Sequence, residues 1–600
     1  MCGILAYFSK KGITKDILEE SINSLKSIKH RGPDGEGLVL INSKSGSFKK
    51  ILLDDLPKDL RINVDHFNEI EDYKFDLILG HRRLSIIDLS SNGHQPMFFN
   101  ENWITYNGEI YNYIEIRQEL ISNGYQFTSN TDTEVILKAY DFWGEKCIGK
   151  FNGMWSFIIW DNKTKSIIIS NDRFGVKPLY SFKNNETYIF TSEIRQFKYF
   201  SEINLSVNQE NYNLFLNYGY TPLDNTTYFN EIKRFPKSSL LKFDFSNFNK
   251  EEHIQYYSIY NVKKRFELNF SDAIHEFSSL LTQSIEIRKR SDVKLGVSIS
   301  GGIDSTLILQ FLNQFTDNEK VQTFSAISPN KIGDESKFIY EVHKHFDVDT
   351  CFSYPLKEFN EADFYDFLDH VEFPVKTMSF YAQWNISKLM KSKGVTINLV
   401  GQGADEVFGG YRTHYIRYLR HLILKGNLIT YFREVNAYSE LKGIRKNILH
   451  RIVILDIGVL LMFKVGLRKI DVKMLNHWNK TSDITDFLKN DLNFYQLPFF
   501  LHSDDRSSMA HSIETRHPFL DYRIVDFGYS LSNEFCFKNG WSKYILRQSI
   551  NDSLSRIKWR KDKKGYTVPN DELIKKILPE SKNLQFDFRK LCLERVINSF

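Results

Sequence analysis

Residues 294–305 have the sequence KLGVSISGGIDS, in which a short apolar run leads into a turn of serine and glycine. The run 294–299 has the length and composition of a buried parallel strand, and the helical pattern of residues 306–315 begins directly after the turn. Backbone N–H groups converge at such a turn, and the helix dipole favours negative charge there. The stretch therefore predicts an anion-binding loop in a parallel α/β domain.

The loop carries a more specific signal in the string Ser-Gly-Gly-x-Asp-Ser at residues 300–305. A glycine pair before a helix also occurs in ordinary turns, but the full string resembles the pyrophosphate loop of the ATP pyrophosphatases, which split ATP into AMP and pyrophosphate. The lysine-bearing phosphate loop of kinases does not fit this strand end, so we expect adenylation. The resemblance assigns nucleotide contacts to Ser298, Ser300, Gly301, Gly302, Asp304, Ser305, Ala326, Val400 and Gly401.

A second glycine-rich turn, GQGADEVFGGY at residues 401–411, follows the apolar run 395–400. Mg²⁺ is usually held by one or two carboxylates together with substrate phosphates. We therefore predict that Asp304 and Asp405 hold Mg²⁺ beside ATP. The alternative is that Asp405 and Glu406 belong to a solvated loop.

The N-terminal end offers a nucleophile, Cys2. Removal of the initiator methionine would leave this residue with a thiol and a free α-amine, whose pKa of roughly 8 would let it accept the thiol proton. A cysteine at the second position is by itself a weak signal, because it can be an accident of the terminus. The motifs that follow decide between the two readings.

Further motifs follow Cys2 in order, and together they resemble the glutaminase domain of class II (N-terminal-nucleophile) glutamine amidotransferases over roughly residues 1–200. They are RGPD at 31–34, HRRLSIID at 81–88, YNGEIYN at 106–112, TDTE at 131–134 and DRFGVKPLY at 172–180. The resemblance makes Cys2 the nucleophile. It also implies an oxyanion hole formed by the side-chain amide of Asn107 and the backbone N–H of Gly108.

Recognition of free glutamine requires partners for its two charges. By the same resemblance, Arg83 pairs with the α-carboxylate as a planar bidentate donor, and Asp132, helped by Glu109, accepts the α-ammonium. A lone arginine would more simply be a surface residue at a strand end, as Arg82 beside it illustrates. Only the context of residues 83–88 singles out Arg83.

Two C-terminal motifs, DRSSMAHSIETRHPFLD at 505–521 and RKDKKGY at 560–566, extend the resemblance. From residue 2 to about residue 570 the chain resembles the glutamine-hydrolysing asparagine synthetases. By the family pattern Lys563 reaches the phosphates and the charge that develops in the acyl-adenylate step. The alternative is that the basic run 558–564 is a solvated face.

The implied substrates are glutamine, ATP with Mg²⁺, and a carboxylate acceptor. Cys2 would release ammonia from glutamine through a thioester, and ATP would activate the acceptor as an acyl-AMP that ammonia attacks. Aspartate, giving asparagine, is the leading acceptor. The family passes ammonia through an internal tunnel, which predicts an apolar interface between the domains.

The acceptor loop departs from the aspartate-specific pattern at Gln402 and Val400, where those members carry a carboxylate and usually a small hydroxyl residue. A carboxylate can take a proton from the attacking nitrogen, whereas a glutamine amide cannot. Relatives with this loop include proteins thought to amidate other carboxylates, such as uronic acids of surface polysaccharides. A second alternative is a non-catalytic, regulatory relative, which Gln402 alone favours.

Composition sets further limits. The 79 basic and 74 acidic residues give a net charge of +5 without a basic stripe, so no nucleic-acid partner is expected. The five cysteines are odd in number and widely spaced, as in reduced cytoplasmic proteins. No secretory signal is visible, and the apolar run 452–465 is interrupted by Asp456 and shorter than the roughly 20 residues of a membrane span. We expect a buried helix there, no membrane partner and a cytoplasmic enzyme.

The overall expectation is a two-domain protein of the α/β and α+β classes. Strand-like alternation in residues 1–200 predicts an αββα sandwich of the Ntn-hydrolase type, followed by connecting strands at 201–270. Residues 271–600 predict a doubly wound parallel-sheet adenine-nucleotide domain with a helical insertion at about 412–490. The resemblance is also compatible with a homodimer.

Overall fold

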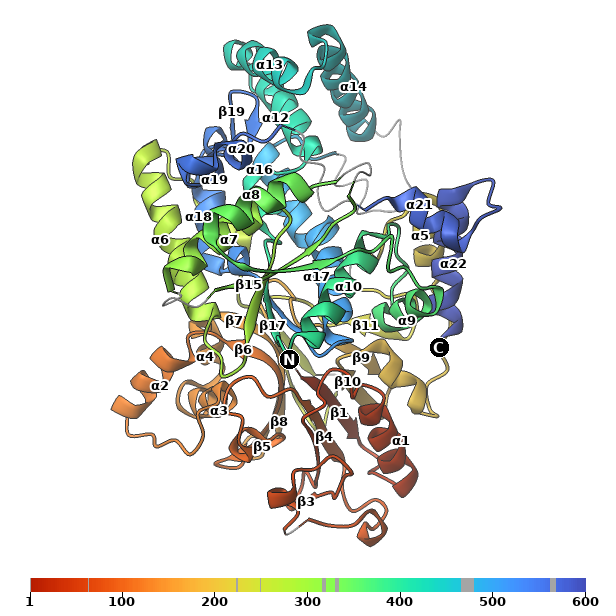
Figure 1. Ribbon diagram of the computed structural model, residues 1–600. Coiled ribbons are helices and arrows are strands. Elements are labelled where there is room, and N and C mark those ends of the chain that lie inside the picture. Colours follow the sequence, from red (N-terminus) through yellow and green to blue (C-terminus); the bar gives the residue numbers. More distant parts are fainter. Residues whose placement is uncertain are drawn as a thin grey trace.

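The structure is a computed structural model that describes residues 2–62, 64–222, 225–248, 250–315, 320–329, 334–465, 480–561 and 568–600. Within these ranges the chain forms two antiparallel sheets, one parallel sheet and a short hairpin. Figure 1 shows the antiparallel sheets in the lower part of the molecule and the parallel sheet above them.

The first antiparallel sheet has the strand order β11-β9-β10-β1-β4-β2-β3. Its strands are β1 (Gly3–Ser9), β2 (Gly35–Ile41), β3 (Phe48–Lys50), β4 (Leu77–Arg83), β9 (Tyr180–Lys183), β10 (Thr187–Thr191) and β11 (Ile232–Arg234). The second has the order β13-β12-β8-β7-β6-β5. Its strands are β5 (Met97–Phe99), β6 (Asn102–Ile110), β7 (Gly153–Asp161), β8 (Ser166–Asn171), β12 (Ser239–Asp244) and β13 (Glu251–Gln255).

The two sheets pack face to face. Alternate side chains of their strands, among them Ile4, Phe8 and Trp160, form a buried cluster between them. Helix α1 (Lys15–Lys26) contacts β1 and β4, and helix α3 (Asp132–Trp143) contacts β5 and β6. This layering confirms the predicted αββα sandwich.

The strands of residues 201–270 extend both sheets of the sandwich. Strand β11 pairs with β9, and β12 pairs with β8, all antiparallel. The segment therefore adds an edge to each sheet, and β13 lies beyond β12 as the last strand of the second sheet.

The parallel sheet has the order β16-β15-β14-β17-β18. Its strands are β14 (Leu295–Ser298), β15 (Gln322–Ala326), β16 (Asp349–Ser353), β17 (Ile397–Leu399) and β18 (Glu514–Arg516). The first strand in sequence is central, and the chain adds strands on one side of it and then on the other. This confirms the doubly wound prediction and places a topological switch point, where ligands bind in such sheets, between β14 and β17.

Helices cover this sheet and extend it. Figure 1 shows α6 and α7 on one side of the sheet and α10 and α17 on the other. The main helices here are α6 (Phe270–Arg288), α7 (Ile303–Leu312), α8 (Ser336–Phe346), α9 (Glu361–Val371), α10 (Ser379–Ser392), α11 (Ala404–Phe408), α16 (Ile484–Asn490), α17 (Leu497–Met509), α18 (Tyr522–Ser530), α19 (Tyr544–Gln548), α21 (Asn570–Ile577) and α22 (Leu584–Asn598).

Helices α12 (Arg412–Leu424), α13 (Leu428–Lys442) and α14 (Lys446–Lys464) project from the top of the molecule in Figure 1. The predicted helix within residues 452–465 is confirmed, but its predicted burial is wrong. The side chains of Ile454 and Leu455 are 61% and 68% exposed, because α14 packs through one face only. Among the described residues, no helix combines the length and hydropathy that crossing a membrane requires.

One buried apolar cluster joins the sandwich to the parallel-sheet half. Leu84, Ile86 and Met154 from the sandwich share it with Val297 and Ile299 at the end of β14. The interface is therefore apolar in part, as the tunnel argument predicts. Beside this cluster, however, it carries buried charges that the sequence did not reveal.

Candidate active sites

Cys2 lies immediately before β1 and is buried, with 9% of its surface exposed. Its backbone N–H donates to Asn107 Oδ1 at 3.0 Å, and its Sγ lies 3.9 Å from the carbonyl oxygen of Leu84. Burial raises the pKa of the Cys2 thiol. A base close to the sulfur is therefore needed before the residue can attack as a thiolate.

The predicted oxyanion donors lie in the middle of β6. Asn107 is fully buried, and within the described residues its Nδ2 has no hydrogen-bond partner. A buried amide donor without a partner costs about 1–3 kcal/mol, and a ligand oxygen that accepts from it would remove that cost. At Gly108, a Cβ would lie 2.2 Å from the carbonyl oxygen of Met154, so the close packing of β6 against β7 requires glycine.

Arg83 ends β4, the strand that pairs with β1 and so reaches Cys2. Its Nη1 donates to the carbonyl oxygen of Ser90 at 2.6 Å, and its Nη2 donates to that of Asp88. A Cβ at Gly93 would lie 2.1 Å from Nη2. Backbone groups therefore fix the plane of the guanidinium, as bidentate recognition of a carboxylate requires.

The two acids predicted to bind the α-ammonium, Asp132 and Glu109, are both buried. Asp132, the first residue of α3, accepts hydrogen bonds from Tyr106 Oη at 2.7 Å and from the backbone N–H of Ile110 at 2.9 Å. Burial raises the pKa of Asp132, and it raises the pKa of Glu109 well above its usual range. A bound ammonium would stabilise both charged forms, so the pair suits the role predicted for it.

Strand β18 of the other half contributes charges to this region that sequence reasoning missed. Arg516 Nη2 lies 3.6 Å from Glu109 Oε1, and Arg516 Nε donates to Glu514 Oε1 at 2.6 Å. Residues two apart on a strand point to the same face. That spacing within residues 505–521 was the available signal, although it names no partner.

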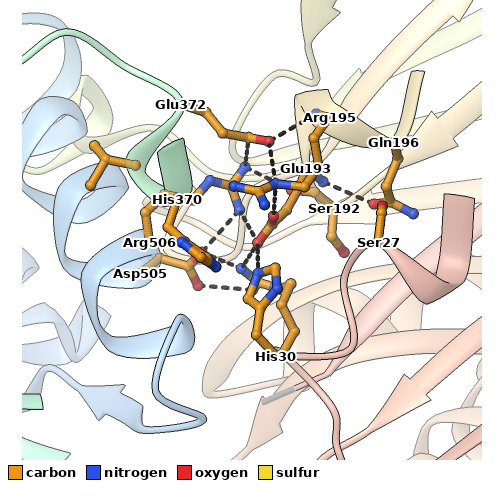
Figure 2. A network of polar contacts seen from close by, with 12 residues as sticks. Ser27, His30, Ser192, Glu193, Arg195, Gln196, His370, Glu372, Asp505 and Arg506 are labelled. Atoms are coloured by element: carbon orange, nitrogen blue, oxygen red, sulfur yellow. Dashed lines mark hydrogen bonds and ion pairs between the residues drawn. The ribbon is translucent and has the colours of Figure 1, made fainter. Parts of the chain in front are cut away.

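A buried ionic network ties the nucleophile to helix α17. Arg31 Nε donates to the carbonyl oxygen of Cys2 at 3.1 Å, and its Nη atoms donate to both oxygens of Asp505 at 2.8 and 3.1 Å. The same guanidinium donates to Glu193 at 3.0 Å. Figure 2 shows how Asp505 and Arg506 of α17 meet Glu193 of the sandwich. The position of Cys2 therefore depends on contacts with the other half.

The network continues at Glu372, directly after α9. Its carboxylate accepts the backbone N–H groups of Ile194 and Arg195 at 2.9 and 2.8 Å and pairs with Arg506 Nη2 at 3.1 Å. Arg195 also pairs with Glu372, at 3.2 Å. The buried network thus contains three arginines and three carboxylates, and Figure 2 labels all of them except Arg31.

Loss of one charge from this network should be costly. Because Asp505→Asn removes a carboxylate and leaves Arg31 short of a buried counter-charge, we expect the free energy of unfolding to fall by about 3–5 kcal/mol. Glutamine hydrolysis should slow as well, since Arg31 holds the carbonyl of Cys2. Thermal denaturation and ammonia release measure the two effects. Asp54→Asn, which removes one partner of an exposed ion pair with Lys26, is the control and should change neither; equal behaviour of the two variants would contradict the expectation.

The predicted phosphate loop has the expected strand-turn-helix form. Gly301 adopts φ +63°, and a Cβ there would lie 2.8 Å from Phe338 Cβ. The loop ends at Gly302, the N-cap of α7, and the backbone N–H of Ser300 donates to Ser305 Oγ at 3.2 Å. The N-terminus of α7 thus lies just after the carboxyl end of β14, as an anion site of this kind requires.

The second glycine turn meets this loop at the switch point. A Cβ at Gly401 would lie 2.8 Å from Asp304 Cβ, so the turn after β17 contacts the start of α7. Val400 N–H donates to the carbonyl oxygen of Arg516 at 3.1 Å, and Ser298 Oγ donates to Asn398 Oδ1 at 2.9 Å. Ala326 ends the neighbouring strand β15.

Asp304 and Asp405, the predicted metal ligands, share one cation in the structure. Lys543 Nζ lies 2.7 Å from both oxygens of Asp304 and 2.5 Å from Asp405 Oδ1. Lys543 is buried and adopts φ +53° at the N-cap of α19. The two carboxylates therefore converge on one point, which fits Mg²⁺ bound together with phosphate oxygens.

Lys543 is a residue that sequence reasoning missed, because a single lysine outside the quoted motifs carries no visible signal. Lys563 lies outside the described residues. Arg560 donates from Nη1 to the carbonyl oxygen of Gly301 at 3.1 Å and so contacts the phosphate loop. Gln402 is half-buried in the turn between Gly401 and Gly403.

Known proteins are similar to this chain over most of its length. A glutamine amidotransferase domain model matches residues 65–257, and an asparagine synthase model matches residues 276–587. A Methanocaldococcus jannaschii protein provisionally named glutamine-hydrolysing asparagine synthetase 2 is 34% identical over 71% of this chain and 78% of its own. Glutamine-hydrolysing asparagine synthetase 1 of Bacillus subtilis is 26% identical over 97% and 90%. Amidase chry2 of Gibberella zeae is 26% identical over 68% and 59%. The chain belongs to the asparagine synthetase family of glutamine-hydrolysing amide-forming ligases.

Proposed function

We propose that this enzyme transfers ammonia from glutamine to a carboxylate that ATP has activated as an acyl-AMP, and that aspartate is the leading acceptor. The observation that carries the proposal is the presence of both kinds of site in one chain. Cys2 lies beside Asn107, whose Nδ2 has no hydrogen-bond partner among the described residues, and the carboxylates of Asp304 and Asp405 converge at the end of β14.

In the first half-reaction, the Cys2 thiolate attacks the side-chain carbonyl of glutamine. A C–S bond forms, the C–N bond breaks, ammonia leaves, and water then hydrolyses the thioester to glutamate. Once Met1 is removed, the α-amine of Cys2 can take the thiol proton. Asn107 Nδ2 and the N–H of Gly108 would stabilise the oxyanion.

Binding of glutamine would use the groups at the edge of this site. Arg83 would hold the α-carboxylate, and Asp132 with Glu109 would hold the α-ammonium. The raised pKa values of the two acids support this assignment, because a bound cation would offset the desolvation that burial imposes on their charged forms.

In the second half-reaction, an oxygen of the acceptor carboxylate attacks the α-phosphorus of ATP and pyrophosphate leaves. Ammonia then attacks the acyl carbon and AMP departs. We infer that Asp304 and Asp405 would hold Mg²⁺, which supplies positive charge to the phosphates. The ammonium of Lys543 lies between these two carboxylates. If a metal ion displaced it from them, it would be free to bind the same phosphates, a role that the resemblance assigns to Lys563.

We also propose which residues form each of the two catalytic units. Residues 1–200 with the strands of 201–270 form the glutaminase unit, and residues 271–600 form the synthetase unit, with the helices near 412–490 as an insertion. The pairing of β11 and β12 with the sandwich supports the assignment of the connecting strands to the first unit.

The identity of the acceptor is a separate proposal. The names of the Methanocaldococcus and Bacillus relatives favour aspartate. Gln402, which cannot act as a base, favours a second candidate, another carboxylate such as a uronic acid.

The test is release of AMP and pyrophosphate from ATP with Mg²⁺ and glutamine, with aspartate as the only added acceptor and a control without acceptor. We expect release that depends on aspartate, together with asparagine. Glutamine hydrolysis without aspartate-dependent pyrophosphate would reject aspartate, and uronic acids would then be tested in the same assay.

A further inference from the structure

A cavity of about 580 Å³ lies apart from the glutamine and ATP sites. Its walls come from the loop after β8 at residues 171–179, from the strands β11 to β13 and the turn after them, and from the start of α17. These segments come from both halves of the protein. None of the lining residues is assigned to the glutamine site or to the ATP site. The volume lies within the range of about 300–1,000 Å³ that is typical of small-molecule sites.

The charge of the cavity wall is one-sided. Its basic lining residues are Lys177, Arg234, Lys237, His253 and His502, whereas no described lining residue is acidic. Lys237 Nζ donates to the carbonyl oxygen of Asn493 at 2.6 Å, and Arg234 Nη2 lies 3.5 Å from His502 Nδ1. Within the described ranges neither Arg234 nor Lys237 forms an ion pair, and each also lies over an aromatic ring, Arg234 over Phe373 and Lys237 over Phe494.

The electrostatics of Lys237 agree with this reading. Burial, with a smaller effect from Arg234, lowers the pKa of Lys237 to about 7. The carboxylate of Asp172 acts on Lys237 from outside the cavity lining, and its oxygens accept the backbone N–H groups of Phe174, Val176 and Lys177. Two cations without a carboxylate among the described lining residues favour an anion between them.

The remaining wall is apolar and aromatic. Phe174, Tyr257, Tyr260 and Phe494 all line the cavity. Aromatic faces suit a flat ligand body, and the adjoining cations suit a carboxylate, sulfonate or phosphate attached to it. The carbonyl that accepts from Lys237 belongs to the π-helical turn Asp491–Tyr495. Such turns are rare in proteins as a whole, but those that occur are often found at functional sites.

We propose that this cavity is a binding site for a small aromatic anion, with the anionic group between Arg234 and Lys237 and the ring between Phe174 and Phe494. The ligand would also contact His502, which lies one helical turn before Asp505 on α17. A ligand here would thus contact α17. Asp505 of this helix binds Arg31, and Arg31 in turn holds the carbonyl of Cys2. The cavity is therefore suitable for an effector of the glutaminase reaction.

The probe for this site is 8-anilinonaphthalene-1-sulfonate, an aromatic sulfonate whose fluorescence rises when it leaves water. We expect saturable binding to the native full-length protein. Because R234Q/K237M removes the two cations proposed to hold the anionic group, it should weaken this binding by about tenfold or more. The control K233Q/K250Q removes the same charge from exposed lysines outside the cavity and should bind like the wild type.

Exposed apolar side chains on α14 could also take up the dye, so the decisive quantity is the difference between the two double variants. Equal binding by both would overturn the proposal. A third variant, Ser258→Trp, fills the cavity without removing charge and should abolish dye binding in the cavity. Full binding by a folded Ser258→Trp protein would also overturn the proposal. The measurement uses neither glutamine nor ATP, so its failure is distinct from failure of the proposed function.

Discussion

Cys2→Ala should abolish glutamine-dependent amide synthesis and leave synthesis from ammonium salts unchanged. The thiol is the proposed nucleophile, and we expect its removal to lower the glutamine-dependent rate by about a thousandfold or more. The phosphate loop and the Asp304–Lys543–Asp405 group are formed without Cys2. Parallel assays of amide product with glutamine and with ammonium chloride measure both effects.

The matched control is Cys147→Ala. Cys147 is a fully buried thiol of the same half, and burial raises its pKa well above the usual range. Because an inert buried thiol contributes packing rather than chemistry, this variant should keep both activities and lose some stability. If Cys2→Ala also removes ammonia-dependent synthesis, the assignment of the two half-reactions to separate halves is wrong.

Sequence patterns were sufficient where the structure is local. The strand, turn and helix of residues 294–312 depend on an apolar run, two glycines and a helical period, all within a short window, and the structure confirms them. The position of Gly301, with φ +63° and no room for a Cβ, likewise follows from its place in the motif.

Contacts between distant segments could not be predicted in this way. Arg31 and Asp505 each lie in a motif that was visible, but the hydrogen bonds between them close a separation of 474 residues. Lys543 gave no signal at all, because its role depends on two carboxylates brought to it by the fold. The interface was expected to be apolar from the tunnel argument, and the buried charges beside its apolar cluster come from such long-range pairs.

The burial of α14 was mispredicted for a different reason. A run of apolar residues indicates that a helix can be buried, but it does not show which neighbours are available to cover it. The helix packs on α12 and α13, which leaves Ile454 and Leu455 on the outer face. Hydrophobicity alone therefore predicted the element correctly and its environment wrongly.

Asp304→Ala should abolish release of pyrophosphate while glutamine hydrolysis continues. Asp304 lies at the start of α7, where its carboxylate shares Lys543 with Asp405. Without it, one of the two proposed Mg²⁺ ligands is lost and Lys543 is drawn to Asp405 alone. Since charge compensation by positioned cations commonly contributes several kcal/mol to phosphoryl chemistry, we expect the rate to fall by about a hundredfold or more.

The control for this variant is Asp349→Ala, because Asp349 is an exposed aspartate on the edge strand β16 of the same sheet. It should release pyrophosphate at the wild-type rate, and both variants should hydrolyse glutamine normally. Unchanged pyrophosphate release by Asp304→Ala would show that the ATP site does not lie at the end of β14. Loss of glutamine hydrolysis in the same variant would instead mean that the phosphate loop acts on Cys2 through the interface, for which the Arg31–Asp505 contact offers a physical route.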